Sequence, residues 1–225
     1  MAIIELKDIS KIYKIGKIKI TALRNVSLSV KKGEFVAIMG PSGSGKTTLM
    51  NIIGLLDRPT SGAYFLNQKR VDQMKPKEQA KIRNQGIGFI FQLFNLLPRM
   101  STFSNVMLPF TYSKNKLSYK EKKKRAFLLL KKVGLSHRIN HFPNELSGGE
   151  KQRVAIARAL VCNPLIILAD EPTGTLDSKT SKEIMRIFRE LNREGRTIIM
   201  VTHEKEIAEY AKRIIKLKDG RIVSS

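Results

Sequence analysis

The pattern of apolar positions along the chain predicts short strands that alternate with helices. Short, nearly continuous apolar runs, typical of strands, lie at 34–39, 63–66, 87–91, 165–169 and 197–201. Longer mixed runs on either side of Gly16, and a shorter pair around Asp219-Gly220, predict joined strands at 3–13, 18–30, 213–217 and 221–223. Alternation of strands and helices predicts an α/β fold with a mainly parallel sheet.

The middle of the chain is predicted to be mostly helical. Prolines at 98, 109 and 143 separate its segments. One helix should begin at a capping box of Ser118 and Glu121 and end at Gly134. We therefore expect a helical lobe of about residues 93–162, inserted into an α/β lobe of about residues 1–92 and 163–225.

Two further helices are expected directly after strands. The first covers 48–56. The second should have Thr180 and Glu183 as its capping box and stop at Gly195, and its apolar stripe consists of Ile184, Ile187, Phe188 and Leu191.

The segment Gly40–Thr47 reads GPSGSGKT and matches the pattern G-x-x-x-x-G-K-[ST] between a strand and a helix. Its backbone N–H groups would surround the phosphates of a nucleoside triphosphate, while Lys46 reaches the β- and γ-phosphates and Thr47 ligates Mg²⁺. The expected nucleotide-binding residues here are Gly40, Pro41, Ser42, Gly43, Ser44, Gly45, Lys46, Thr47 and Thr48. We call Gly40–Thr47 the phosphate loop.

Polar residues that suit hydrolysis follow three of the predicted strands. Asp170 would hold Mg²⁺, and the adjacent Glu171 could accept a proton from the attacking water. Gln92 ends another strand, where its amide could contact Mg²⁺ or that water. His203 could contact the γ-phosphate. The predicted catalytic residues are therefore Glu171, His203 and Gln92, and the predicted metal ligands are Thr47, Gln92 and Asp170.

A second phosphate-binding turn is predicted at LSGGE. Leu146, Ser147, Gly148 and Gly149 form a turn that opens directly into a helix, and Glu150 follows it. A helix start has unpaired N–H groups, and the Ser147 hydroxyl adds a donor. We call Leu146–Gly149 the Ser147 turn. Two phosphate-binding turns and one nucleotide per chain indicate a site closed by two copies of the chain.

Composition limits the function classes. The chain has 225 residues, 42% hydrophobic and 27% charged, as in a folded protein. No apolar run approaches the roughly 18 residues that span a bilayer, and the N-terminus does not resemble a signal peptide, so we expect a cytosolic protein. The only cysteine, Cys162, excludes an internal disulfide and is expected in the core.

The net charge of +23 is compatible with nucleic acid, anionic lipid or solubility alone. The densest basic run, Lys120–Arg125, is interpreted as a solvated helix face.

Together these motifs resemble the nucleotide-binding subunit of an ABC transporter through essentially the whole chain. The resemblance lies in the order and spacing of GPSGSGKT, Gln92, LSGGE, IILADE with Pro172, the Thr175–Asp177 loop and His203. The phrases NIIGLLDRPTSG, GFIFQLFNLLP, NVMLP and ADEPTGTLDS resemble the branch of lipoprotein-releasing (LolD) and macrolide-exporting (MacB) ATPases.

This resemblance implies an L-shaped P-loop NTPase with a RecA-like core, an antiparallel β subdomain and a helical subdomain. Two copies would pack head to tail around two ATP molecules, each between Gly40–Thr47 of one copy and Ser147–Glu150 of the other. Asp177 would lie at the contact, and Tyr13 would stack on adenine. The region around Gln92–Pro109 would receive coupling helices of membrane permease subunits, at the cytoplasmic face of the membrane.

The chain departs from the branch at three positions. Glu150 replaces the commoner glutamine and would add negative charge near the γ-phosphate. Thr175 stands where asparagine or alanine is frequent, and Ser104 where a glutamate usually precedes the asparagine.

The family resemblance leaves two functions open. One is export or extraction of a lipoprotein, peptide or drug. The other is mechanical signalling across the membrane without cargo, as in cell-division (FtsE) relatives. A nucleic-acid partner is not expected, because the chain has one cassette and no coiled-coil insertion.

Overall fold

The structure is a computed structural model, and it describes residues 1–113 and 117–224. The chain forms two compact units, one of Met1–Ala80 with Asn192–Ser225 and one of Lys81–Leu191. The expected lobe limits near residues 92 and 163 stay a prediction, because a compact unit and a functional lobe need not divide the chain at the same place.

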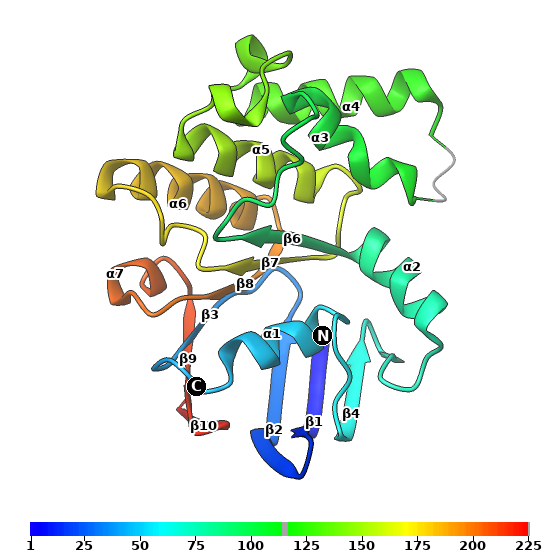
Figure 1. Ribbon diagram of the computed structural model, residues 1–225, viewed down its shortest axis with the longest axis vertical. Coiled ribbons are helices and arrows are strands. Elements are labelled where there is room, and N and C mark those ends of the chain that lie inside the picture. The colour runs from blue at the N-terminus through cyan, green and yellow to red at the C-terminus, as the bar shows by residue number, and fades with distance from the viewer. Residues whose placement is uncertain (114–116, 225) are drawn as a thin grey trace. The chain divides into compact units, whose positions relative to one another are not determined.

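The first unit begins with an antiparallel sheet of strand order β2-β1-β4-β5 (Figure 1). Its strands are β1 (Ala2–Ile15), β2 (Ile18–Lys31), β4 (Ser61–Leu66) and β5 (Lys69–Arg70). Ile4, Leu6 and Ile9 of β1 are at most 1% exposed, so one face of this sheet is core. The predicted strand pair around Gly16 is confirmed.

A second set of strands in this unit surrounds β3 (Phe35–Met39). Strand β3 pairs in parallel with β8 (Thr197–Val201) and with β9 (Arg213–Lys218), and β10 (Arg221–Ser224) pairs antiparallel with β9. Burial on both faces explains the continuous apolar run of β3. Helix α1 (Lys46–Ile53) and the short helix α7 (Lys205–Ala208) follow β3 and β8 in the chain.

The second unit contains the parallel pair β6 (Ile87–Phe91) and β7 (Ile166–Asp170). Helices α3 (Thr102–Met107), α4 (Tyr119–Lys132) and α5 (Gly148–Leu160) pack against one another (Figure 1). Helices α2 (Pro76–Gly86) and α6 (Ser178–Arg193) each have residues in both units. The unit also contains the 3₁₀ turns η1 (Leu108–Thr111), η2 (Ser136–Arg138) and η3 (Pro143–Glu145).

The predicted helix ends are partly correct. The capping box of Ser118 and Glu121 at the start of α4 is confirmed. The helix expected at 48–56 begins earlier, at Lys46, and ends at Ile53, because the phosphate loop passes directly into the helix.

The expected capping box of Thr180 and Glu183 is wrong. Helix α6 begins at Ser178. The carboxylate of Asp177 accepts hydrogen bonds from the Thr180 N–H at 2.9 Å and the Thr180 hydroxyl at 2.6 Å. Asp177 therefore caps the helix one turn before Thr180. Glu183 instead lies 3.4 Å from Arg153.

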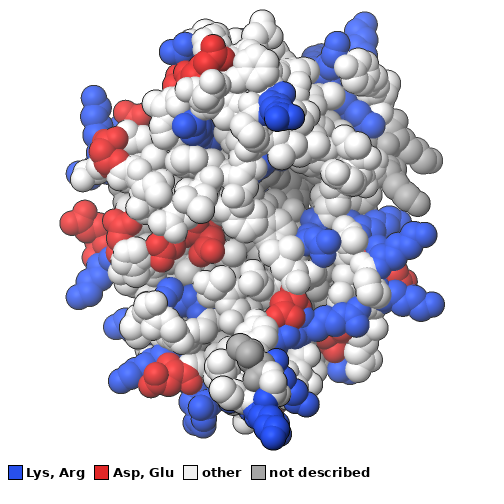
Figure 2. Space-filling model, in the orientation of Figure 1, with Lys and Arg blue, Asp and Glu red and all other residues white. Residues whose placement is uncertain are grey.

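Four other observations bear on the sequence analysis. Cys162 is half-buried rather than fully in the core, and burial raises the pKa of its thiol. Lys120, Lys123 and Lys124 are exposed on α4, as expected for a solvated helix face. Figure 2 shows the basic side chains in several groups on the visible face, with acidic ones between them. Across residues 1–113 and 117–224, no helix combines the length and apolar character that crossing a membrane requires.

Candidate active site

The phosphate loop connects β3 to α1 in the first unit, and its glycines are required by its shape. Gly43 and Gly45 have φ of 77° and 100°, in the left-handed region that favours glycine. A Cβ on Gly45 would lie 2.6 Å from the carbonyl oxygen of Ala22. A side chain at position 45 would therefore displace the loop from the neighbouring strand.

The start of α1 suits an anion. Gly45 is the N-cap and provides no side-chain hydrogen bond, and the first turn contains no acidic residue. Backbone N–H groups at this end have no partner within the helix, and the helix dipole favours negative charge beside them.

Lys46 and Ser44 show that the loop fits a phosphate group. Lys46 is 8% exposed, and its ammonium donates hydrogen bonds to the carbonyl oxygens of Gly40 and Pro41, both at 2.8 Å. A phosphate oxygen is a stronger acceptor for this cation than a carbonyl oxygen. The Ser44 hydroxyl is buried and has no hydrogen-bond partner among the residues that the structure describes, and a phosphate oxygen would provide one. Thr47 is exposed.

Tyr13 is held in place by a network that the sequence analysis did not identify. Its hydroxyl donates to Asp57 at 2.8 Å, and the Lys11 ammonium lies 2.6 Å from the same carboxylate. Burial, and then the Asp57 hydrogen bond, raise the pKa of Tyr13, while the nearby Thr48 side chain lowers it. Lys11 lies 4.8 Å from the centre of the Tyr13 ring. This cation therefore covers one face of the ring.

Gln92 and Glu171 lie together in the second unit. Phe91 and Asp170 are paired in register at the ends of β6 and β7, so Gln92 and Glu171 follow at the same edge. A Cβ on Gly174 would lie 2.8 Å from the Gln92 amide nitrogen and 3.3 Å from a Glu171 carboxylate oxygen. Gly174 thus leaves room for both side chains.

Glu171 has an unusual backbone conformation. Its φ is 43°, in the left-handed region that costs a non-glycine residue on the order of 1 kcal/mol or more. Strain of this kind is common at functional sites, where it aims a side chain. Asp170 precedes it as the last residue of β7 and is half-buried.

The Ser147 turn caps α5 in the way that the sequence predicts for a helix start. The Ser147 hydroxyl accepts a hydrogen bond from the Glu150 N–H at 3.2 Å. Ser147 is exposed, and its hydroxyl keeps a proton to donate. Gly149 is buried, and a Cβ there would lie 2.5 Å from Thr180, so this glycine allows α6 to pack closely.

Glu150 completes this cap. One carboxylate oxygen accepts the Ser147 N–H at 2.8 Å, and the other lies 3.0 Å from the Arg138 guanidinium. The Ser147 backbone N–H is the largest cause of a lowered Glu150 pKa, and Arg138 lowers it further. The sequence analysis missed Arg138, because an ion pair between separate segments leaves no local pattern.

The remaining predicted residues are at exposed segment ends. Asp177 caps α6, and the Thr180 hydrogen bonds lower its pKa. His203 is exposed and follows the buried Thr202 at the end of β8. The first unit therefore contains both Tyr13 and the phosphate loop, and the second brings together Gln92 with Glu171 and Ser147 with Glu150.

Comparison with known proteins identifies the family. The family model described as ABC transporter matches residues 23–174. The chain belongs to the ABC transporter family. It is 56% identical to an uncharacterized ABC transporter ATP-binding protein, YvrO, of Bacillus subtilis, over 97% of this chain and 94% of that protein. It is also 55% identical to the macrolide export ATP-binding/permease protein MacB of Bdellovibrio bacteriovorus, over 98% of this chain. The match covers 33% of MacB, so this chain spans about a third of that relative's length.

Solved ABC cassettes have the same fold. The ATP-binding cassette MJ0796, in a dimeric post-hydrolysis state bound to ADP and Pi, is 49% identical with a TM-score of 0.90, over 98% of this chain and 97% of that one. CbiO1 of Clostridium perfringens is 32% identical with a TM-score of 0.88, over 99% of this chain and 87% of that one. The predicted P-loop α/β fold and the predicted ATPase activity are confirmed.

Proposed function

We propose that this ABC cassette works as a head-to-tail dimer that hydrolyses two ATP molecules and moves membrane permease subunits. The observation that carries the proposal is that one chain holds two different glycine-containing helix starts, to each of which we assign a phosphate contact. The start of α1 has no side-chain cap and adjoins Lys46, whereas α5 begins with a complete capping box beside the exposed Ser147 hydroxyl. The dimeric state of the similar MJ0796 cassette, bound to ADP and Pi, supports a dimer of this chain.

In this proposal each residue has a distinct task. The Lys46 ammonium leaves its two loop carbonyls and binds the β- and γ-phosphates, while Tyr13 stacks on adenine. Ser147 and the N–H groups of the other copy's turn bind the γ-phosphate from the opposite side. Glu171 accepts the proton of the attacking water, with Gln92 beside it, and His203 contacts the γ-phosphate.

The oxygen donors at three positions fit Mg²⁺. The exposed Thr47 hydroxyl, the Gln92 amide and the Asp170 carboxylate are ligands of the type that Mg²⁺ prefers. When bound, Mg²⁺ would neutralise charge on the phosphates.

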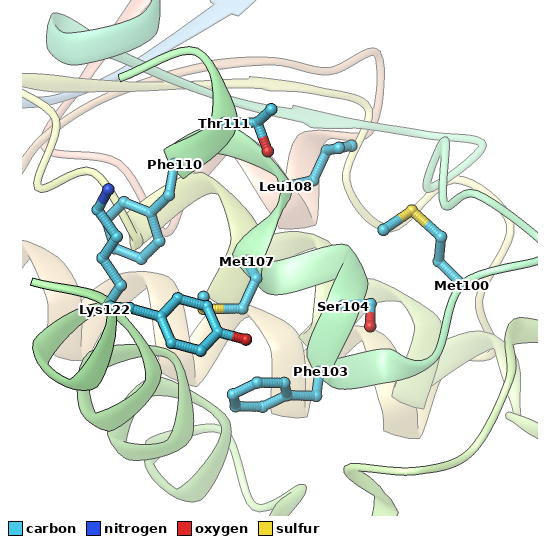
Figure 3. A pocket seen from close by; sticks show the side chains of 9 residues that line it. Met100, Phe103, Ser104, Met107, Leu108, Phe110, Thr111 and Lys122 are labelled. Atoms are coloured by element: carbon cyan, nitrogen blue, oxygen red, sulfur yellow. The ribbon is translucent and has the colours of Figure 1, made fainter. Parts of the chain in front are cut away.

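A pocket in the second unit is the proposed docking place for the permease. It has a volume of about 360 Å³, and Figure 3 shows side chains from α3, η1 and α4 around it. The lining residues are Met100, Phe103, Ser104, Met107, Leu108, Phe110, Thr111, Tyr119 and Lys122. This mostly apolar lining fits an apolar side chain on a cytoplasmic helix of a permease. Relatives named ATP-binding/permease proteins carry both activities in one chain.

We further propose that the cassette lies at the cytoplasmic face of the membrane and that the transporter exports or extracts a lipoprotein, peptide or drug. The relatives named for macrolide export support the outward direction. The permease that co-purifies with the chain would identify the cargo class.

The dimer is tested with Glu171→Gln, which should bind ATP without hydrolysing it and accumulate as an ATP-dependent dimer in sedimentation. Adding Ser147→Arg should abolish the dimer, because the long cation fills the place of the γ-phosphate contact, while ATP binding by the monomer is retained. Ser224→Arg, a change at an exposed serine of β10, is the control and should dimerise normally. A Ser147→Arg protein that dimerises with ATP as readily as its parent contradicts the proposal.

A further inference from the structure

The segment before α5 forms a chain of contacts that ends at Ser147. The Arg138 guanidinium donates through Nε to Glu150 at 3.0 Å. Through Nη1 it also contacts Nε2 of His141 at 2.9 Å. Because a guanidinium only donates, Nε2 of His141 is the acceptor in this contact. Arg138 is thereby oriented from both sides.

The same segment is fastened to α3. The carbonyl oxygen of His141 accepts the Thr102 N–H at 2.7 Å and the Thr102 hydroxyl at 3.0 Å. The Phe103 N–H donates to the carbonyl oxygen of Ile139 at 2.9 Å. The first turn of α3, which leads into the pocket lining, therefore holds the backbone around Arg138.

Glu150 needs this cation for an electrostatic reason. Its carboxylate is only 17% exposed and lies at the start of α5, where the proposed γ-phosphate would bind. An unneutralised carboxylate there would repel the phosphate, since the energy between like charges grows as their separation falls. It would also lose its fixed orientation toward the Ser147 N–H, on which the capping box depends.

We propose that Arg138 is a positioning residue, which neutralises Glu150 and holds the Ser147 turn in the form that binds the γ-phosphate of the partner copy's ATP. This inference rests on the proposed dimer and deepens it. It also explains how this chain carries an acidic residue directly after the two glycines. With glutamine at position 150 the cap would persist through the amide oxygen, and Arg138 would no longer be needed.

The test is a double-mutant cycle in the Glu171→Gln protein, with the ATP concentration that gives half-maximal dimer as the readout. Arg138→Ala should raise that concentration by about tenfold, the loss expected for one charge-assisted hydrogen bond at a binding site. Glu150→Gln alone should change it by less than about twofold, and Arg138→Ala should have little further effect in that background.

Controls separate positioning from folding. Binding of a fluorescent ATP analogue to the monomer should stay within about twofold in every variant, because the phosphate loop is untouched. Arg138→Lys keeps the positive charge but lacks the planar set of guanidinium N–H donors. It should therefore restore part of the dimerisation that Arg138→Ala loses. Arg70→Ala removes an ion pair with Asp72 at 3.2 Å and should leave dimerisation unchanged.

The experiment distinguishes a failure of the proposed dimer from a failure of the proposed role of Arg138. If the Glu171→Gln parent forms no ATP-dependent dimer, the proposed function is wrong. If the parent dimerises but Arg138→Ala has the same effect with glutamate or glutamine at position 150, the positioning role of Arg138 is overturned.

Discussion

The phosphate loop and the Ser147 turn are both glycine-containing helix starts, yet they differ in charge and in capping. The phosphate loop has an uncapped N-terminus, a buried lysine and no acid in the first turn. The Ser147 turn has a complete capping box and a carboxylate in its first turn. From this difference we propose that the loop binds nucleotide by itself, whereas the turn adds contacts only to a nucleotide that is already held.

The largest expected effect is on the rate of ATP hydrolysis, and it should leave nucleotide binding by the phosphate loop and the Ser147 turn unchanged. Glu171→Gln should lower the rate of ATP hydrolysis by about 10²–10⁴-fold, the usual contribution of a general base. ATP binding should be unchanged, because neither phosphate-binding helix start is altered. Single-turnover hydrolysis and nucleotide binding measure the two effects. Hydrolysis at the normal rate would remove Glu171 from its role.

The next largest effect is on the affinity of the monomer for ATP, which tests the phosphate loop directly. Lys46→Ala should weaken ATP binding to the monomer by roughly ten- to hundredfold, as expected when a charge-assisted contact to phosphate is lost. Ser147→Ala is the matched variant for the turn and should change monomer binding by less than about twofold. Titration with a fluorescent nucleotide measures both. Equal losses in the two variants would mean that the turn also binds nucleotide in the monomer.

A smaller effect concerns stability. Ser147→Ala and Asp177→Ala each remove a side-chain cap, from α5 and α6 respectively. Each should cost about 1 kcal/mol, or a few degrees in Tm. Lys46→Ala removes no cap at the start of α1 and should not show this loss. Thermal denaturation in the absence of nucleotide measures all three.

The smallest effect is the pH dependence that Glu150 contributes. Its folded pKa lies below the ordinary value of 4.5. Its contribution to folding stability is therefore complete above that pH and is lost as the pH falls through the folded pKa. Glu150→Gln should be slightly less stable than the parent at neutral pH, and the difference should disappear in acid. A stability difference that grew on acidification would contradict the assigned contacts.

The sequence predicted the parts of the fold that depend on local patterns. The apolar runs of β3, β6, β7 and β8 and the capping box of α4 are confirmed, since burial and caps act over a few neighbouring residues. Helix α2 was missed because PKEQAKIRNQG contains almost no apolar stripe. The cap of α6 was misassigned because Asp177 and Thr180 lie one turn apart at the start of this helix, and both residue types are good N-caps.

In the candidate site, too, the features that depend on local motifs were predictable and the contacts between distant segments were not. The phosphate loop and the Ser147 turn were predictable from contiguous motifs. Asp57 beside Tyr13 and Arg138 beside Glu150 were not, because their partners come together only through folding. The strained φ of Glu171 likewise has no signal in the sequence.

The most direct test of the shared site mixes two inactive variants. Lys46→Ala has a damaged loop and an intact turn, and Ser147→Arg has the opposite. A head-to-tail mixed dimer would contain one site with an intact loop from one chain and an intact turn from the other. We predict that each variant alone hydrolyses almost no ATP and that the mixture regains activity. A mixture that is no more active than either variant alone would contradict the account.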